Sequence, residues 1–450
     1  MIPLLLFAAV EAGFAETDIT PDVGPKAKPV WMAGFGTGRQ AEGVADRLFA
    51  RAVVFREGKK KVAFVSLDLV GLFLASAERV RAKLPGFDHV VVSCTHNHEG
   101  PDTMGLWGRL PLVSGVDADY LALVEKRAVE AIKEADKAAK PVTARVGSAK
   151  APELLHDSRK PILKHDDLVV IVLERETKPV GLVVQWNCHP ETLDSRNKRI
   201  SADFVGYAVA ALKKRYACPV VYLTGTVGGL MTSLRVDIKG EKGEKLKDGT
   251  FEKTARYGEL LARVAEKAEK AAAAAALSPI EAERREVFLP LDNRLYVAAR
   301  QFGALTREAY LWKPGAKPER VEEIDPRKRH AIRTEVGHVR LGEVGIACIP
   351  GEIYPELVLG KVVDPPEKGA DFPDAPIEPG VFAQMRAKHK LIVGLANDEI
   401  GYILPKRQWD EVPPFCYGAK KAPYGEQNSL GPETGPLLCE AFRAMMKARR

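Results

Sequence analysis

Short apolar runs rich in β-branched residues alternate with longer amphipathic stretches between residues 25 and 365. A short apolar run between turn-forming residues is typical of a buried strand, whereas apolar residues at a period of 3.6 predict a helix. The predicted strands are Ala52–Phe55, Val62–Leu67, Val90–Ser93, Leu168–Leu173, Gly181–Trp186, Val220–Leu223, Val344–Ile349 and Leu391–Leu395. The predicted helices are Ala75–Leu84, Asp117–Lys140, Phe204–Tyr216, Glu252–Leu277 and Pro436–Lys447.

Three segments of unusual composition refine this pattern. The fourth predicted helix contains six consecutive alanines, Ala271–Ala276, and because alanine is the strongest helix former we expect a solvated surface helix there. Lys239–Gly249 is charged and glycine-rich and is expected to be a mobile insertion. Asp364–Gly380 is proline-rich and is expected to be neither helix nor strand. No internal repeat is visible, and we expect a single domain over residues 25–445.

The composition is that of an ordinary folded protein. The 450 residues are 46% hydrophobic and 28% charged, and 67 Lys+Arg against 60 Asp+Glu give a formal net charge of +7. These values exclude disorder, collagen and coiled coil for the whole chain, and so mild a charge does not indicate a nucleic-acid partner. The six cysteines form no C-x-x-C pair, which excludes a zinc ribbon and a disulfide-dense scaffold while leaving one or two disulfides open.

The N-terminus has features of a signal peptide. Met1–Val10 is almost entirely apolar, and Gly13 and Ala15 are small residues at positions −3 and −1 of a cleavage site after Ala15. We therefore predict a signal peptide over residues 1–15 and a secreted or periplasmic protein. The basic residues that usually precede the apolar region are missing, so the alternative is an apolar first strand of a cytoplasmic protein. No later apolar run approaches the ~20 residues of a membrane-spanning helix, and we expect no transmembrane segment.

The segment after the predicted strand Val90–Ser93 carries the most informative chemistry. His96 and His98 follow the strand at positions i and i+2, a spacing that places both imidazoles on one side of an extended chain. A Gly100-Pro101 turn then ends the segment. Neutral imidazole is a good zinc ligand, so the pair is a candidate metal site, with surface or core histidines as the alternative.

Three more predicted strands end in residues that could bind a metal. Polar residues at several strand ends are the arrangement expected of a site built at one rim of a sheet. Two histidines, a carboxylate and a further oxygen donor suit zinc and leave a position for water or substrate. The donors are His189 after Gly181–Trp186, Glu352 after Val344–Ile349, and Asp398 and Tyr402 after Leu391–Leu395.

An ordered series of motifs between residues 32 and 435 resembles the N-terminal catalytic domain of the neutral/alkaline (non-lysosomal) ceramidases. Thr95-His96-Asn97-His98 is similar to the family's T-H-T-H, and Pro350-Gly351-Glu352 matches its P-G-E. The remaining motifs, in chain order, are Met32–Phe35, Arg47–Ala52, Phe64–Asp68, Cys188–Pro190 with Ser201–Asp203 and Gly206-Tyr207, Gly394–Asn397 with Tyr402, and Tyr424 with Ser429–Pro432.

The resemblance implies a fold, a metal and a reaction. The fold would be α+β, with two packed, mostly antiparallel β-sheets flanked by helices and the metal site at one rim. The metal would be Zn²⁺, bound by His96, His189, Glu352 and Tyr402. The reaction would be hydrolysis of the amide bond of an N-acyl sphingoid base or related lipid by metal-activated water, with peripheral contact with membrane lipid.

Three further residues would contribute to catalysis on the same resemblance. His98, beside a ligand histidine, could move a proton or stabilise the developing oxyanion. Arg159 lies roughly where the family has an arginine, and Tyr424 could donate a hydrogen bond to the tetrahedral intermediate. A salt-bridged surface arginine and a tyrosine at the edge of the core are the alternatives for these two residues.

The chain also departs from the family pattern. Met231 stands where the family has a serine with a part in catalysis, and Thr232 and Ser233 are only neighbours of that position. Asn97 and Glu99 replace a threonine and a serine in the first histidine motif. The family's C-terminal β-sandwich domain is not expected in these 450 residues. The leading hypothesis is therefore a zinc-dependent, ceramidase-like amidohydrolase, with a zinc hydrolase for another amide or ester, or a metal-binding pseudoenzyme, as alternatives.

Overall fold

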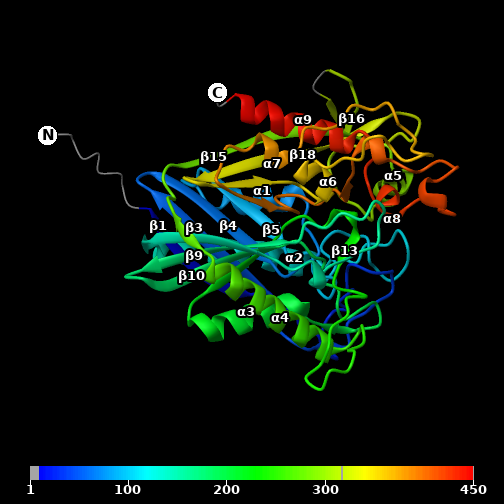
Figure 1. The fold of residues 1–450 in the computed structure, drawn as a ribbon. Coiled ribbons are helices and arrows are strands. Elements are labelled where there is room, and N and C mark those ends of the chain that lie inside the picture. The colour runs from blue at the N-terminus through cyan, green and yellow to red at the C-terminus, as the bar shows by residue number, and fades with distance from the viewer. Residues whose placement is uncertain (1–9, 316–317, 449–450) are drawn as a thin grey trace.

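The computed structural model describes residues 10–315 and 318–448 (Figure 1). Over these residues the strands form three large sheets and three two-stranded pairs. The first sheet has the order β5-β4-β3-β1-β6, in which β4 and β5 are parallel and the other neighbours antiparallel. Its strands are β1 (Glu11–Asp18), β3 (Phe49–Glu57), β4 (Lys60–Leu67), β5 (His89–Cys94) and β6 (Lys140–Pro141).

The second sheet has the order β12-β10-β9-β7-β14, and only its β10–β12 pair is parallel. In the third sheet β15 pairs with β18 beside the path β17-β16-β18-β19-β21, and only β19 and β21 are parallel. The strands of these two sheets are β7 (Thr143–Lys150), β9 (Asp167–Arg175), β10 (Lys178–Trp186), β12 (Val220–Thr224), β14 (Ala273–Ala275), β15 (Ile280–Leu291), β16 (Ala309–Leu311), β17 (Glu319–Val321), β18 (His330–Leu341), β19 (Val344–Cys348) and β21 (His389–Val393).

The core is built by the alternation of side chains along each strand. In β3, Val53 and Phe55 point into a central core shared by all three sheets, whereas Ala52 and Val54 point to the outer face. The outer face of the first sheet packs on α1 (Leu74–Ala82) and α2 (Ala118–Ala138). The second sheet is covered by α3 (Asp203–Tyr216) and α4 (Phe251–Lys270), which lie side by side (Figure 1).

The third sheet adds a further packed layer. One of its faces joins the central core, and the other packs on α9 (Thr434–Lys447), α6 (Pro355–Leu359) and α7 (Val381–Gln384). The remaining short elements lie mostly among the loops: β2 (Gly43–Val44), β8 (His156–Asp157), β11 (Arg199–Ile200), β13 (Met231–Thr232), β20 (Glu352–Ile353), β22 (Tyr402–Ile403), α5 (Arg294–Gln301) and α8 (Tyr424–Gln427). The fold is therefore α+β, as the resemblance implied, but with three large sheets in place of two.

Each of the eight predicted strands is a strand in the structure, and the predicted helices are confirmed except at the alanine run. The prediction of helix over Ala271–Ala276 is wrong, because α4 ends at Lys270 and Ala273–Ala275 form β14 on the edge of β7. The strand pairing gives the backbone N–H and C=O groups of this segment hydrogen-bond partners on β7. Helix propensity reflects only the local sequence and does not include such pairing. Asp364–Gly380 contains no helix or strand, as predicted.

The structure bears on the predicted signal peptide and on the disulfides that the sequence left open. Residues 1–9 of the predicted signal peptide lie outside the described residues, and a cleavage after Ala15 would divide β1. The six cysteines are all buried and unpaired, and all lie within the described residues. None of the helices among the described residues is both long and apolar enough to cross a bilayer.

Candidate metal centre

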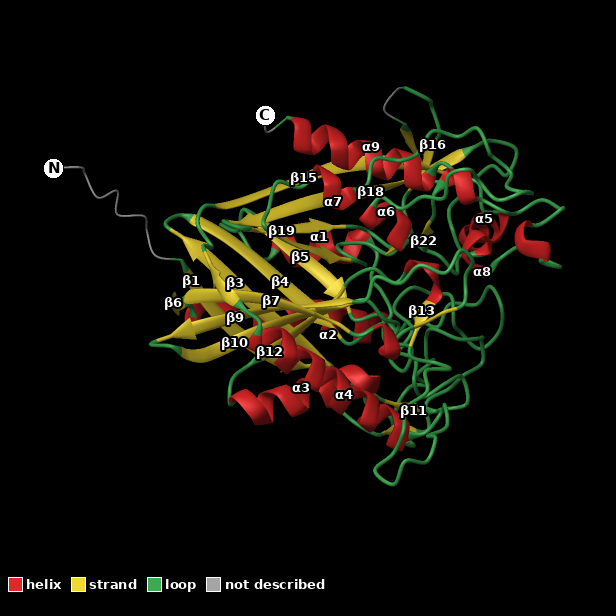
Figure 2. Cartoon of the chain, viewed as in Figure 1, coloured by secondary structure: helices red, strands yellow, loops and turns green. Residues whose placement is uncertain are grey.

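Four strands end at the side of the molecule where the loops gather (Figure 2). β5, β10, β19 and β21 each belong to a parallel pair, and parallel neighbours end on the same side of a sheet. Buried hydrogen bonds then join the three sheets at these ends. Thr224 Oγ1 donates to Thr95 O at 2.7 Å, Gly394 N donates to Thr224 O at 2.9 Å, and Ser93 Oγ donates to Gly394 O at 3.1 Å. The segments after the four strands are therefore held together.

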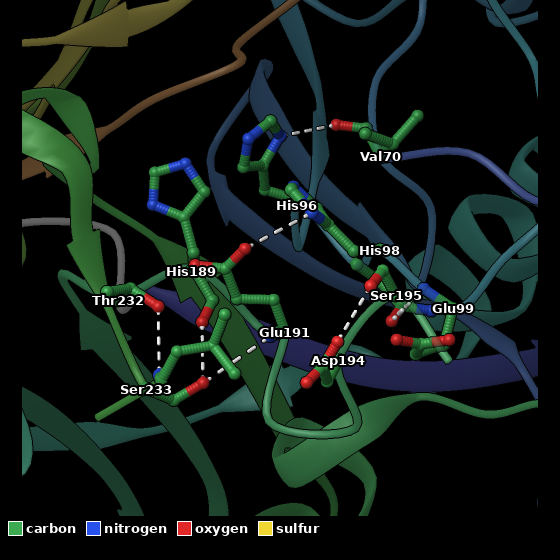
Figure 3. A network of polar contacts seen from close by, with 12 residues as sticks. Val70, His96, His98, Glu99, His189, Glu191, Asp194, Ser195, Thr232 and Ser233 are labelled. Atoms are coloured by element: carbon green, nitrogen blue, oxygen red, sulfur yellow. Dashed lines mark hydrogen bonds and ion pairs between the residues drawn. The ribbon is translucent and has the colours of Figure 1, made fainter. Parts of the chain in front are cut away.

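Backbone carbonyls orient two histidines in this region. His96 Nδ1 lies 2.8 Å from Val70 O (Figure 3). His189 Nδ1 lies 2.7 Å from Met231 O. A carbonyl can only accept, so each Nδ1 carries a proton. Each Nε2 is then left to donate to a carboxylate when it is protonated, or to offer a lone pair to a metal when it is not. Both Nε2 atoms face one carboxylate oxygen, Glu352 Oε2, at 3.3 Å from His96 and 2.9 Å from His189.

Tyr402 joins this group through the pairing of β20 with β22. The two short strands are parallel, and Glu352 is the register partner of Tyr402. The Tyr402 hydroxyl lies 3.3 Å from His189 Nε2. The structure thus brings together the four side chains that the sequence resemblance assigned to the metal: His96, His189, Glu352 and Tyr402.

Glu352 and the two histidines that face it shift one another's pKa values in this buried site. Burial alone would raise the pKa of Glu352, but the charge of His96 and the hydrogen bond from His189 hold it well below its ordinary value. Burial likewise opposes protonation of His189, and Glu352 outweighs burial and raises the pKa of that histidine. Burial and the charge of Glu352 raise the pKa of Tyr402 well above its ordinary value. A cation bound at the two Nε2 atoms would supply positive charge beside this buried carboxylate.

The donor set fits a divalent metal ion. Metal-bound histidines commonly donate their second ring nitrogen to a carbonyl, which is what Val70 and Met231 provide here. A second grouping is also compatible with a metal, since one ligand atom from each of His96, His98 and His189 lies within 4.8 Å of the others. His96 and His189 belong to both sets, so they would hold the metal in either arrangement.

His98, predicted to be catalytic, lies beside the proposed ligands. Its Nδ1 is buried, has no hydrogen-bond partner, and lies 3.5 Å from the Glu191 carboxylate (Figure 3). Burial, followed by the charges of His96 and His189, lowers the pKa of His98 well below its ordinary value. Burial and the neighbouring histidines therefore favour the neutral ring, and the catalytic role of His98 stays a prediction.

An apolar cavity of about 930 Å³, part of it open to solvent, adjoins the histidines. His96, His98, Glu352 and Tyr402 form one part of its wall. The rest of the wall is mainly apolar and aromatic, as is usual for small-molecule sites. These residues include Phe73, Met104, Leu106, Trp107, Leu305 and Ile332.

Of the two other predicted catalytic residues, Tyr424 lines the cavity and Arg159 does not. Tyr424 lines the cavity at the start of α8, and its ring centroid lies 5.9 Å from that of Tyr402. Arg159 is not among the residues that line the cavity; its guanidinium is 6% exposed, forms an ion pair with Glu426, and donates to Gln408 O at 3.0 Å. The catalytic roles of Tyr424 and Arg159 stay predictions. Arg159 has the ion pair of the alternative interpretation, but it is buried and not on the surface.

Met231, which the sequence resemblance places at the position of the family serine, contributes its backbone to the site. Its carbonyl accepts hydrogen bonds from both Nδ1 and the backbone N of His189, while its side chain is fully buried in the core of the second sheet. The neighbouring Ser233 hydroxyl donates to His189 O at 3.1 Å and is also buried. Neither side chain lines the cavity.

Sequence reasoning missed one carboxyl group in the cavity wall. Glu399 lies three residues before Tyr402, is 4% exposed, and accepts a hydrogen bond from Gly401 N at 2.7 Å. The motif around Asn397 and Asp398 drew attention to this segment, but nothing distinguished Glu399 within it. The carbonyls of Val70 and Met231 were also missed, because a backbone acceptor leaves no signal in side-chain patterns.

Fold and site together define an α+β protein with a buried candidate metal centre at the edge of an apolar cavity. Residues 11–155 match the family model described as neutral/alkaline non-lysosomal ceramidase, N-terminal. These findings confirm the resemblance seen in the motifs: the chain is related to the neutral/alkaline ceramidases.

Individual relatives agree with the family match. The neutral ceramidases of Drosophila melanogaster and Drosophila pseudoobscura pseudoobscura are each 25% identical over an alignment of 241 residues that covers 47% of this chain. The match spans 33% of the length of either insect protein. A solved structure titled as ceramidase complexed with C2 has a TM-score of 0.73 at 16% identity, covering 98% of this chain and 75% of that one. Neutral ceramidase from Pseudomonas aeruginosa has a TM-score of 0.70 at 16% identity, covering 98% and 74%. At this identity the structures support the fold alone.

Proposed function

We propose that the protein is a zinc-dependent hydrolase that cleaves the amide bond of an N-acyl sphingoid base or related lipid amide. The observation that carries the proposal is the convergence of His96, His189, Glu352 and Tyr402 at the wall of an apolar cavity. Such a site can hold a metal ion beside a long apolar substrate. The family match over residues 11–155 supports the same reaction class.

Zn²⁺ is the metal that this donor set suits, with His96, His189, Glu352 and Tyr402 as its ligands. When bound, zinc lowers the pKa of a coordinated water to about 7 and polarises a substrate carbonyl. The protein contributes the orientation of the ligands through the carbonyls of Val70 and Met231.

Water is the nucleophile that the cavity favours. Among the described residues that line it there is no serine, threonine or cysteine, and the buried Ser233 hydroxyl is directed to the backbone of His189. A covalent acyl-enzyme through such a side chain is therefore not supported. His98 lines the cavity beside the proposed ligands and would accept the proton of the attacking water, and the Tyr424 hydroxyl would donate to the developing oxyanion.

Two alternative functions also include a bound metal, but they differ in the bond that is cleaved or in whether any bond is cleaved. The first is a zinc hydrolase for a different amide or ester, since cavity shape and apolar lining do not specify the bond that is cleaved. The second is a metal-binding protein that binds a lipid amide without turnover, which the presence of Met231 in place of the family serine motivates. The buried position of Met231, away from the cavity, favours turnover by water over this second alternative.

Metal analysis of the purified chain tests the site, and substrate assays test the activity. We expect about one zinc per chain, lost in His189→Ala and Glu352→Gln and retained in His98→Ala, measured by plasma mass spectrometry. A panel of fluorogenic N-acyl amides and matched esters should then show zinc-dependent cleavage that chelation abolishes and added zinc restores. Metal content unchanged by His189→Ala would contradict the site. Zinc-loaded protein that cleaves neither amides nor esters would contradict the hydrolase assignment.

A further inference from the structure

Glu191 places a carboxylate beside His98, outside the proposed ligand set. Its Oε2 lies 3.5 Å from His98 Nδ1, and the side chains of Glu191 and His98 are 13% and 9% exposed (Figure 3). His98 lines the apolar cavity, whereas Glu191 is not among the residues of its wall. The carboxylate therefore approaches His98 without reaching into the space that a substrate would occupy.

Backbone hydrogen bonds and close packing hold the two residues in this arrangement. His98 N donates to Pro190 O at 3.1 Å, which fixes the histidine beside the residue that precedes Glu191. The Glu191 carbonyl accepts from Asp194 N at 3.1 Å. Gly34 packs against the imidazole so closely that a Cβ there would lie 2.3 Å from His98 Cγ. The ring therefore has little room to turn away from the carboxylate.

His98 Nδ1 is buried and has no hydrogen-bond partner. In the other two histidines of the centre, His96 and His189, Nδ1 has a backbone carbonyl as its partner. A buried polar atom without a partner is unfavourable, and natural proteins keep few such atoms. The Glu191 carboxylate can supply the missing acceptor. Its separation of 3.5 Å exceeds a hydrogen bond, but catalytic hydrogen bonds are often long in the free enzyme and shorten once substrate binds.

We propose that Glu191 is a positioning residue that accepts a hydrogen bond from His98 Nδ1–H and so leaves Nε2 as the basic nitrogen of that ring. This inference rests on the proposed function, in which His98 accepts the proton of the attacking water. A carboxylate on the second nitrogen of a catalytic histidine holds the ring in one tautomer and one orientation. The proton from water binds to Nε2 and the Nδ1 proton stays in its hydrogen bond, so Glu191 itself neither gains nor loses a proton.

Nitrogen NMR of the full chain with ¹⁵N-labelled histidines measures the tautomer of His98 directly, in the presence of zinc and without turnover. The His98 signals are assigned by their loss in His98→Asn. At about pH 8, above the ordinary histidine pKa of about 6.5, we expect a protonated Nδ1 and an unprotonated Nε2 in the wild type. Glu191→Leu should show signals averaged between the two tautomers. A proton on Nε2 in the wild type, or His98 signals unchanged in Glu191→Leu, would overturn the proposal.

Kinetics of the zinc-loaded full chain test whether this contact serves the reaction. Glu191→Leu should lower kcat on an N-acyl amide by about 10- to 100-fold and change KM by less than about twofold, because Glu191 does not line the cavity. Glu191→Gln keeps an uncharged acceptor and should lie between Glu191→Leu and the wild type. Asp194→Asn removes a nearby carboxylate that pairs with Arg196, and as the matched control it should leave kcat unchanged. Zinc is measured in each variant, so that kcat is given per bound ion.

A double variant shows whether Glu191 acts through His98. His98→Ala combined with Glu191→Leu should be no slower than His98→Ala alone, because residues that act as a unit give non-additive losses. A further loss in the double variant, a raised KM at unchanged kcat, or full activity of Glu191→Leu would contradict the proposal. If no substrate is cleaved, the NMR result still decides: a His98 Nδ1 proton that depends on Glu191 would support this inference while the hydrolase proposal fails.

Discussion

Met231 shows how one residue can serve a site through its backbone alone. Its carbonyl fixes the orientation of His189, while its side chain fills the core of the second sheet. Met231→Ser places a hydroxyl in that apolar core and removes buried volume. We therefore expect the free energy of unfolding to fall by about 2–4 kcal/mol, with no gain in kcat/KM per folded molecule.

Urea denaturation and kinetic assays of the same preparations measure both effects of the Met231 change. Met231→Leu is the matched control, because a swap of similar volume costs less than about 1.5 kcal/mol and leaves the carbonyl in place. A rise in activity of Met231→Ser above the wild type would show that a hydroxyl at this position reaches the reacting atoms.

Glu356 predicts a pH dependence of stability that is independent of the metal ligands. The side chain is 2% exposed, and burial raises its pKa from 4.5 to about 7. The folded protein keeps this proton up to about pH 7, whereas the unfolded chain loses it near pH 4.5, so the free energy of unfolding falls as the pH rises between these values. From pH 5 to pH 8 this group accounts for a loss on the order of 2–3 kcal/mol.

Glu356→Gln removes that titration while it keeps the shape of the side chain. We expect the stability of the variant relative to the wild type to improve by about 2–3 kcal/mol between pH 5 and pH 8, measured by urea denaturation at both pH values. A difference between variant and wild type that is the same at pH 5 and pH 8 would contradict the raised pKa.

The sequence predicted the side chains of the candidate site but not the backbone groups that orient them. His96, His189, Glu352 and Tyr402 follow predicted strands, and the motif order made them recognisable. The Val70 and Met231 carbonyls could not be predicted, because they reach the histidines through contacts between segments far apart in the chain. Arg159 could be located but not interpreted, since its partner Glu426 lies 267 residues away in sequence.

At the scale of elements, local pattern predicted the strands with a strong apolar signal and missed those without one. β15 and β18 are long strands that carry many charged residues, so their period was not recognised. The prediction for the alanine run was wrong for the opposite reason. Its helix propensity is high, but Ala273–Ala275 pair with β7 and the helix ends before them. In both cases the strand forms because it pairs with a partner that is distant in the sequence, and for the alanine run this pairing overrides helix propensity.

Gly147 in β7 allows the end of α4 to approach this edge. A Cβ at Gly147 would lie 2.1 Å from Ala268 O and 2.8 Å from Ala272 N, both backbone atoms. Gly147→Ala should therefore lower the free energy of unfolding by about 1–3 kcal/mol, measured by thermal and urea denaturation. Gly43→Ala, where the added Cβ meets nothing within 4 Å, is the control. Equal stability of the two variants would show that β14 and the end of α4 do not pack as described.

At the scale of the whole molecule, exposed apolar side chains occur beside segments that line the cavity. Leu110 is 59% exposed shortly after Trp107, and Phe302 is 71% exposed directly after α5, which contributes Tyr296 to the wall. Gly105 contacts the Ala304 backbone so closely that a Cβ would clash, which places the two segments side by side. We propose that these two exposed side chains, Leu110 and Phe302, contact a lipid surface that supplies the substrate.

Polar substitution of this surface should reduce binding to vesicles. We expect Leu110→Ser/Phe302→Ser to sediment less with phosphatidylcholine vesicles that contain a lipid amide, and to cleave that amide more slowly. Cleavage of a short-chain amide in solution should stay unchanged, because the cavity is intact. Val412→Ser removes an apolar side chain that is 60% exposed and does not line the cavity, and it should match the wild type. Vesicle binding unaffected by the double substitution would rule out this surface as the lipid contact.

The assembly of the centre from the ends of three sheets has a consequence for folding itself. The proposed ligands extend from His96 to Tyr402, so a bound ion would cross-link most of the chain. His96, His189 and Glu352 follow strands of three different sheets, so the ion would also link the sheets. An ion held only by the folded state adds its binding free energy to stability, about 4 kcal/mol at a thousandfold excess over Kd. Chelation should therefore lower the melting temperature of the wild type and leave that of His189→Ala unchanged. The ion proposed to drive hydrolysis would then also act as a staple that keeps the three sheets together.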